Sequence, residues 1–369
     1  MLAVRDLHAA AQVPAFAVPL VLQAPFLPYG PFKAGFNAIS YPEILLEAGF
    51  GNAATLDFLA RAWRSLFRLG QVDALVADFS PAAMLAARLA RIPILHLGDG
   101  FTVPPDEDRR RTFDSVAASA DSRSRNASER VLACVNTVLK AGGAAPWQSV
   151  AELHAAADTV LATYPELDHY RGCARSTGYF GHVEIPAEDN AGWRPVPGPR
   201  ILAYLKPTAP EFEATVEVLR RLPAQTRIYA SGVVRADESA SGVGLAWHAA
   251  PMAFASAAKG ADLVVSNAGH GATCASLLAG KPLCLLPTVH EQLLTARNVG
   301  AIGAGETLLQ VRDPRRIRRA IVRCIDDPGL RAAAQDFASR HSAQASSTAV
   351  RLAEIADRFL ELVNRREAA

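Results

Sequence analysis

Several features that define particular classes of protein are missing from this sequence. No apolar run approaches the ~18 residues of a membrane-spanning helix. The N-terminus has no basic segment followed by a long apolar core, so no signal peptide is predicted. The net charge is only +2 over 369 residues, which gives no electrostatic reason to expect nucleic-acid binding. We therefore expect a cytoplasmic protein without a membrane span and without a nucleic-acid partner.

Cysteine is scarce as well, and its spacing carries no signal. The five cysteines are odd in number, scattered and without C-x-x-C spacing (Cys134, Cys173, Cys274, Cys284 and Cys324). Neither a disulfide framework nor a zinc site is predicted, and this usage fits the reducing cytoplasm. We expect no resident cofactor.

The rest of the composition is that of an ordinary globular protein. The chain is 50% hydrophobic and 20% charged, and it is long enough for two domains with cores of their own. The segment Glu184–Pro199 is dense in proline and glycine and has no periodicity, which is typical of a linker. We predict a first domain over residues 1–185, a linker over 186–199, a second domain over 200–345 and a terminal helix over 346–369.

Short apolar strands alternate with helical patterns along both halves, which predicts an α/β fold with parallel sheets. The predicted strands are Met1–Asp6, Phe16–Leu22, Asp73–Asp78, Ile92–Leu97, Thr159–Ala162, Arg200–Leu205, Thr226–Ser231 and Leu245–Trp247. The predicted helices are Leu7–Val13, Glu43–Gly49, Leu56–Leu69, Ala82–Leu89, Ser128–Ala141, Val150–Ala156, Glu211–Leu222, Phe254–Lys259, Pro314–Ile325, Leu330–Arg340 and Thr348–Arg365. Two long segments, Pro25–Pro42 and Pro104–Asn126, are predicted to be loops.

The most informative stretch is Ala261–Gly305. It begins with a buried strand at Leu263–Ser266, breaks at a glycine-rich turn and continues as a helix that Gly280 stops. A second strand at Leu283–Leu286 and a helix starting near Glu291 follow. Such a turn lies at the carboxyl edge of a parallel sheet, where glycines let backbone amides approach a ligand and the helix start favours an anion.

This stretch resembles the donor-binding signature of family 1 glycosyltransferases (UDP-glycosyltransferase-like, MGT-type). Gly269, Gly271, Thr273, Gly280, Pro282, Pro287 and the pair Glu291-Gln292 follow the family pattern without a gap over about 26 positions. The resemblance implies the GT-B fold, in which two Rossmann-like domains face a cleft and a terminal helix returns to the first domain. It also implies inverting sugar transfer without a metal.

The resemblance assigns roles to individual residues. The backbone from Gly269 through His270 and Gly271 to Thr273 would hold the donor diphosphate, with the Thr273 hydroxyl as a helper. Glu291 and Gln292 would bind hydroxyls of the transferred sugar, because a carboxylate and an amide together accept and donate hydrogen bonds. Lys206 follows a predicted strand and either meets a donor phosphate or is solvated.

The sequence departs from the family pattern at several of these positions. Asn267 stands where the family usually has a phosphate-contacting histidine, and His270 either substitutes for it or only fills the turn. Pro251 matches the family's W-x-P-Q element, but its tryptophan and glutamine are replaced. Trp247 either stacks on the donor base or is an interior residue at a strand end. The base therefore stays open between UDP and TDP.

The first domain resembles the family only after its opening unit. Family members begin with a strand, a loop with glycine and histidine, and a helix, a unit on the order of 30 to 40 residues. The resemblance therefore implies an incomplete first domain, through a late start codon or a lost unit. Asp78 matches the aspartate that orients the catalytic histidine, which would lie in the absent loop; alternatively, Asp78 caps the helix at Pro81.

Three functions remain open at this point. The first is transfer of a sugar from a nucleotide sugar to a hydroxyl acceptor, either a small apolar molecule or a lipid. The segment Pro25–Pro42 would then line the acceptor pocket or be a surface loop. The second is an inactive homologue that binds the donor and serves as a regulatory partner. The third is a nucleotide-sugar epimerase, which shares the GT-B fold, although the spacing from Asn267 to Gln292 follows the transferases.

Overall fold

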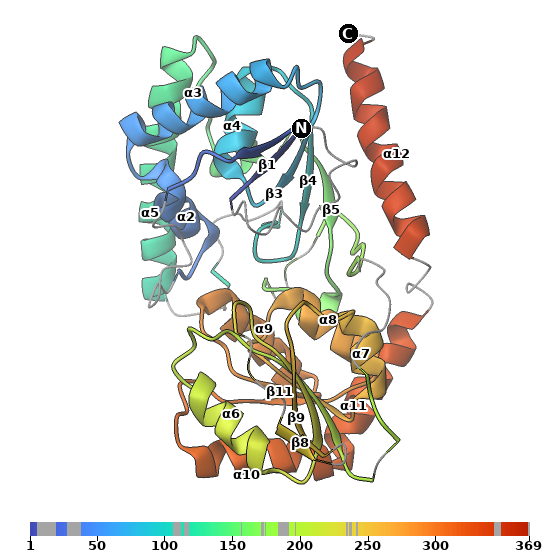
Figure 1. Cartoon of the computed structure of the whole chain (residues 1–369). Coiled ribbons are helices and arrows are strands. Elements are labelled where there is room, and N and C mark those ends of the chain that lie inside the picture. Colours follow the sequence, from blue (N-terminus) through green and yellow to red (C-terminus); the bar gives the residue numbers. More distant parts are fainter. Residues whose placement is uncertain are drawn as a thin grey trace. The chain divides into compact units, whose positions relative to one another are not determined.

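The structure is a computed structural model (Figure 1) that describes residues 1–5, 20–27, 38–105, 112–113, 118–155, 157–170, 173, 175–183, 192–195, 197–233, 235, 238–240, 243–342 and 348–367. The chain forms two compact units. Unit 1 contains residues 1–162, 170–180 and 353–369, and unit 2 contains residues 163–169 and 181–352. Each unit has its own parallel β-strands with helices packed against them, so the predicted α/β class is confirmed.

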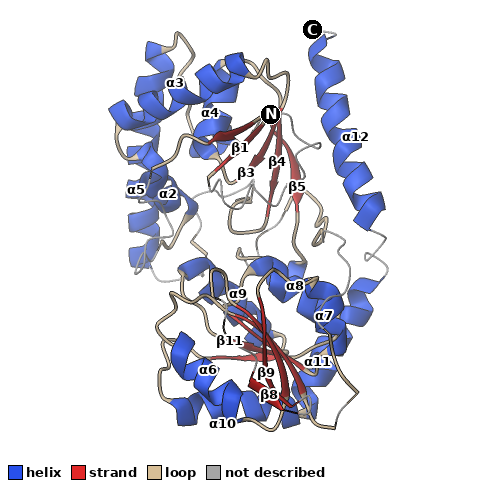
Figure 2. Ribbon diagram, in the orientation of Figure 1, coloured by secondary structure: helices blue, strands red, loops and turns tan. Residues whose placement is uncertain are grey.

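Unit 1 holds two small parallel sheets. Strands β1 (Leu2–Val4) and β2 (Val21–Gln23) form a pair, and β3 (Leu75–Asp78), β4 (Ile94–Gly98) and β5 (Ala157–Leu161) form a second sheet in that order. Its helical elements are α2 (Tyr41–Leu45), a π-helical turn (Leu46–Phe50), α3 (Ala53–Leu69), α4 (Pro81–Leu89), α5 (Ala118–Ala141), a 3-10 turn (Val150–Leu153) and most of α12 (Thr348–Glu367). Figure 2 shows α2–α5 on one side of these strands and α12 on the other.

Unit 2 is built around one seven-stranded sheet with the order β12-β11-β10-β6-β7-β9-β8. Its strands are β6 (Arg200–Tyr204), β7 (Gln225–Tyr229), β8 (Glu238–Ala240), β9 (Val243–His248), β10 (Leu263–Ser266), β11 (Leu283–Leu285) and β12 (Gly305–Thr307). Its helices are α6 (Phe212–Arg221), α7 (Phe254–Gly260), α8 (His270–Leu278), α9 (His290–Ala301), α10 (Pro314–Asp326) and α11 (Pro328–His341), with a 3-10 turn at Pro165–Leu167. All strand pairs are parallel except β8 with β9.

The order of strands in unit 2 creates a switch point between β6 and β10. From β6 the chain moves outward through β7 to β9, then returns to the other side of β6 and continues through β10, β11 and β12. The connections after β6 and β10 therefore leave the sheet in opposite directions. In open α/β sheets, ligands bind in the crevice outside the carboxyl ends of the strands at such a point.

Two hydrophobic cores cover the two faces of this sheet. One core joins the sheet to α6 and α10, and the other joins it to α7, α8, α9 and α11 (Figure 1). The buried residues of α10 show how the sequence produces this: Ile317, Ala320, Ile321 and Cys324 recur at helical spacing and face the core. The arginines between them remain on the outer face.

Most predicted elements are found, with a few corrections. The loop predicted over Pro104–Asn126 is wrong in its second half, because α5 begins at Ala118. Small or polar residues fill its buried positions there (Ser124, Ala127 and Ser128), so no apolar period marks the helix. The helix predicted at Val150–Ala156 is only a 3-10 turn, and the short strands β8 and β12 were not predicted. The predicted helix Leu7–Val13 and parts of Phe16–Leu22, Pro25–Pro42 and Glu184–Pro199 lie outside the described residues.

The packing of the chain differs from the predicted domain limits in three places. Residues 163–169 and 181–199 lie on the first-domain or linker side of those limits, but unit 2 includes them. Within α12, unit 1 takes the part from residue 353 onward. Among the described residues, no helix is long and apolar enough to cross a membrane.

Candidate functional site

The predicted donor segment forms the carboxyl end of β10 at the switch point of unit 2. After Ser266 the chain turns through Asn267, Ala268 and Gly269 into α8. Ala268 has a φ of 59°, which is the left-handed region that few residues other than glycine adopt. Such strained positions persist only where the surroundings hold them, and they are enriched at binding sites.

Asn267 holds the ends of three strands together. Its side chain is buried; Oδ1 accepts a hydrogen bond from the Lys206 backbone N–H at 2.6 Å, and Nδ2 donates to the Leu286 carbonyl at 2.7 Å. Lys206 follows β6, and Leu286 follows β11, so the amide connects both neighbours of β10. This bracing role was not apparent from the sequence, where Asn267 was considered only as a ligand for phosphate.

The start of α8 presents unused backbone donors. The first backbone hydrogen bond of the helix runs from the Thr273 N–H to the Gly269 carbonyl at 3.0 Å, so the N–H groups of residues 270–272 have no acceptor in the helix. A Cβ atom built on Gly269 would meet no atom within 4 Å. The Thr273 hydroxyl is buried, and among the described residues it has no hydrogen-bond partner.

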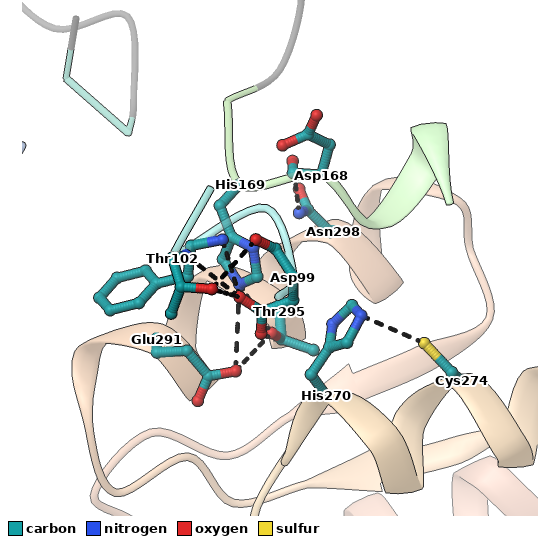
Figure 3. Close-up of polar contacts among 10 residues, drawn as sticks. Asp99, Thr102, Asp168, His169, His270, Cys274, Glu291, Thr295 and Asn298 are labelled. Atoms are coloured by element: carbon teal, nitrogen blue, oxygen red, sulfur yellow. Dashed lines mark hydrogen bonds and ion pairs between the residues drawn. The ribbon is translucent and has the colours of Figure 1, made fainter. Parts of the chain in front are cut away.

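Two histidines lie at this helix start, and they differ in their surroundings. His270 places Nε2 3.4 Å from the Cys274 sulfur (Figure 3). His182, which was not singled out in the sequence, lies against Gly271, since a Cβ there would be 3.3 Å from its ring carbon. Burial lowers the pKa of His182 to about 4, with further lowering by His270 and Arg351, so its imidazole is neutral at pH 7.

The acidic–amide pair lies in the first turn of α9. Gln292 is buried, and its carbonyl oxygen accepts hydrogen bonds from the Thr288 N–H and hydroxyl, both at 2.9 Å. The carbonyl oxygen is therefore occupied, and the NH₂ group is the part of the amide that can donate hydrogen bonds to a ligand. Glu291 places Oε1 3.3 Å from the Thr295 hydroxyl and 4.0 Å from His169 Nε2 (Figure 3).

Lys206 belongs to the same neighbourhood, because its charge interacts with that of Glu291. Partial burial lowers the pKa of its ammonium group, while Glu291 acts in the opposite direction. Lys206, Asn267, the Gly269–Thr273 segment and the Glu291-Gln292 pair, all predicted from the sequence, thus lie on the carboxyl side of the sheet of unit 2. The structure adds His169, His182, Thr288 and Thr295, which no sequence pattern indicates because each is identified only by its contacts.

Asp78, the remaining predicted site residue, lies in unit 1 at the end of β3. The N-cap of α4 is Ser80, so the capping role considered for Asp78 is wrong. Asp78 lines a cavity of about 1090 Å³. Its backbone belongs to the β3–β4 ladder, and its side chain forms no hydrogen bond or ion pair with a described residue. Burial by surrounding atoms and the nearby Asp99 carboxylate both raise the pKa of Asp78, although its side chain reaches solvent.

From the sequence, Trp247 is either a base-stacking residue or an interior residue. It is buried in β9 within the core between the sheet and α6. Arg235 lies over its ring, with the guanidinium carbon 5.1 Å from the ring centroid. The interior interpretation of Trp247 is therefore confirmed.

The chain is similar to known proteins in part of its sequence and in its fold. Residues 248–362 match the family described as erythromycin biosynthesis protein CIII-like, C-terminal domain. The glycotransferase of kitacinnamycin is 18% identical, with a TM-score of 0.63 over 98% of this chain and 90% of that one. Spinosyn rhamnosyltransferase SpnG, complexed with spinosyn aglycone, is 18% identical, with a TM-score of 0.58 over 82% and 79%. The glycosyltransferase VinC, in complex with DTDP, is 15% identical, with a TM-score of 0.57 over 88% and 81%.

The fold is GT-B. A search of curated protein sequences gives no match to the chain. Within the GT-B fold, the match to the CIII-like domain includes the whole stretch from the turn after β10 to the acidic–amide pair. Lys206 and Asp78 lie outside that match.

Proposed function

We propose that this GT-B protein is a glycosyltransferase that moves a sugar from a nucleotide-sugar donor to a hydroxyl group of an acceptor. The observation that carries the proposal is the composition of the switch point in unit 2. There, an open helix start, a lysine and a carboxylate–amide pair lie on the carboxyl side of one sheet. Those groups complement the two parts of a nucleotide sugar, an anionic diphosphate and a polyol.

The helix start of α8 would bind the diphosphate. Its unused N–H groups and helix dipole favour an anion, and Lys206 adds a positive charge. Neither backbone strain nor a neighbouring atom requires glycine at 269, and the open space there would allow close approach of a ligand. The buried Thr273 hydroxyl would gain a partner from the same ligand.

The acidic–amide pair would bind the transferred sugar. The Glu291 carboxylate accepts hydrogen bonds from sugar hydroxyls, and the Gln292 NH₂ group, with its carbonyl held by Thr288, donates to them. We propose direct, inverting displacement at the anomeric carbon without a metal. The departing diphosphate would be stabilised by the same N–H groups that bind it in the ground state.

The acceptor side requires a base, which we propose to be a histidine oriented by Asp78. The edge strands β1 and β3 each have only one partner among the described strands, and both line the cavity next to Asp78. A Rossmann-like sheet has the strand order 3-2-1-4-5-6. Strands β2 and β1 would take positions 3 and 2, and β3, β4 and β5 would take positions 4, 5 and 6. The central position 1 is then left for a further strand. We propose that a strand-loop-helix unit fills this cavity and supplies the histidine.

This part of the proposal is tested by extension. A chain that carries such a unit ahead of β1, encoded in frame, is expected to melt at a higher temperature than residues 1–369, because two unpaired edges become paired. It is also expected to be the more soluble of the two. Equal melting temperatures and equal solubility would contradict the proposal.

The proposal also includes the nucleotide base of the donor, the class of acceptor and the cellular location. A thymidine or uridine diphosphate sugar is the donor we expect, since VinC is described in complex with DTDP and SpnG with thymidine diphosphate. SpnG is also described with an aglycone, which agrees with a small apolar acceptor; a lipid is the other candidate. The scattered cysteines agree with a cytoplasmic location.

The direct test is thermal stabilisation of residues 1–369 by TDP-, UDP- and GDP-sugars, followed by turnover with apolar alcohols. Stabilisation by one nucleotide class and transfer would support the enzyme. If a nucleotide sugar stabilises the protein but neither residues 1–369 nor the extended chain transfers the sugar, the alternative of an inactive donor-binding partner is supported. The lack of a described partner for the Asp78 side chain favours that alternative. No stabilisation by any nucleotide sugar would overturn both.

A further inference from the structure

His169 belongs to a short segment that is fixed to α9 and α11 within unit 2. Tyr164 packs edge-on against Phe337, with ring centroids 5.3 Å apart, and Glu166 pairs with Arg340 and His341. The Asn298 side chain donates to the Asp168 carbonyl at 3.0 Å. His169 follows immediately, and it is buried. The contacts of this segment and the burial of His169 therefore hold its imidazole in place.

The imidazole is connected to the sugar-binding carboxylate through one hydroxyl. His169 Nε2 lies 3.1 Å from Thr295 Oγ1, and Thr295 Oγ1 lies 3.3 Å from Glu291 Oε1 (Figure 3). A threonine hydroxyl has one proton, which goes to the carboxylate, because an ionised carboxylate only accepts. His169 Nε2 must then be the protonated nitrogen that donates to Thr295. The direction of the relay is thus fixed from His169 to Glu291.

We propose that His169 is a positioning residue that orients the Glu291 carboxylate, through Thr295, toward the transferred sugar. The inference rests on the proposed function. A glutamate side chain loses considerable rotamer freedom when it is held in one orientation. The relay holds the carboxylate in one orientation before the donor binds, so this rotamer freedom is not lost on binding the sugar. The diphosphate, which meets α8 and Lys206, does not use this relay.

Titratable groups lie on both sides of this relay. His270 faces His169, with ring centroids 5.9 Å apart, and Lys206 interacts electrostatically with Glu291. A protonated imidazole would still donate from Nε2, so the relay persists in either charge state. The role of His169 is therefore geometric, and its loss should appear in sugar binding and not as a new pH dependence.

The separation of sugar from diphosphate gives the test, with TDP-glucose and TDP as probes of the residues 1–369 protein. His169→Leu and Thr295→Val remove the relay, and we expect each to weaken TDP-glucose binding about tenfold with TDP binding unchanged, the size expected for one hydrogen bond to a charged group. His169→Gln and Thr295→Ser retain donors, and they should keep most of the affinity. Thr215→Val, which removes a buried hydroxyl bonded to the Glu211 carbonyl on α6, is the matched control.

Each outcome decides something different. If the wild-type protein binds neither TDP nor TDP-glucose, and the UDP pair gives the same result, the proposed function fails. If the wild type binds both, and the relay variants lose both equally or lose neither, the role of His169 is overturned. Equal loss in Thr215→Val would also overturn it, because the effect would then follow stability alone. Selective loss of TDP-glucose, with rescue by His169→Gln, supports it.

Discussion

Gly269 and Gly280 are two glycines of the same segment with different physical causes. Gly280 has a φ of 68° and ends α8, where Lys281 N–H bonds to the Ser276 carbonyl at 3.0 Å, so the backbone itself requires glycine. Gly269 has an ordinary φ of −62° and open space where a side chain would be. Gly280 therefore serves the fold, whereas Gly269 leaves open space at the proposed donor site.

This difference predicts opposite effects for the same substitution. Gly269→Ala should change the melting temperature little but weaken TDP binding at least about tenfold, because its methyl group would enter the proposed diphosphate site. Gly280→Ala should lower the free energy of unfolding by about 1–2 kcal/mol from left-handed strain, with TDP affinity retained. Calorimetric titration and urea unfolding of both variants check this. Loss of stability in Gly269→Ala without loss of affinity would contradict it.

His182 predicts a pH dependence of stability. In the unfolded chain it takes up a proton near pH ~6.5, whereas burial holds its pKa at about 4 in the folded protein. Its contribution is therefore complete above pH ~6.5 and is lost as the pH falls toward 4, by about 2 kcal/mol between pH 7.5 and 5. Urea unfolding of wild type and His182→Asn at both pH values measures this. If the difference between the two proteins does not change with pH, the prediction is wrong.

At the scale of elements, the strand ends of unit 2 depend on one side chain. Asn267→Ala would leave the Lys206 N–H and the Leu286 carbonyl without their buried partner, and we expect a loss of about 2–4 kcal/mol in unfolding free energy. Asn52→Ala, which removes the N-cap bond to Thr55 on α3, is the matched control and should cost about 1 kcal/mol. Urea unfolding curves give both values. Equal losses would show that Asn267 does not brace the strands.

The elements that the sequence predicted are those with a strong local period. Buried strands such as Leu263–Ser266 were found with their predicted bounds, because an uninterrupted apolar run identifies them. The start of α5 was missed because its buried face consists of small and polar residues. The proposed donor-binding residues from 267 to 292 lie close together along the chain, so a motif can indicate them. His169 and Thr295 are 126 residues apart, and only the fold brings them together.

At the scale of the whole molecule, the two units have separate cores, and all the proposed donor groups lie in unit 2. A ligand stabilises the part of a protein that binds it, by about 2.7 kcal/mol at 100 times its Kd. Saturating TDP should therefore slow amide exchange in β6, β10, β11 and α8 and leave β3 and β4 of unit 1 unchanged. Hydrogen exchange followed by mass spectrometry separates the two units. The Gly269→Ala variant should show clearly less slowing at the same TDP concentration. Protection spread evenly over both units would place the donor site elsewhere.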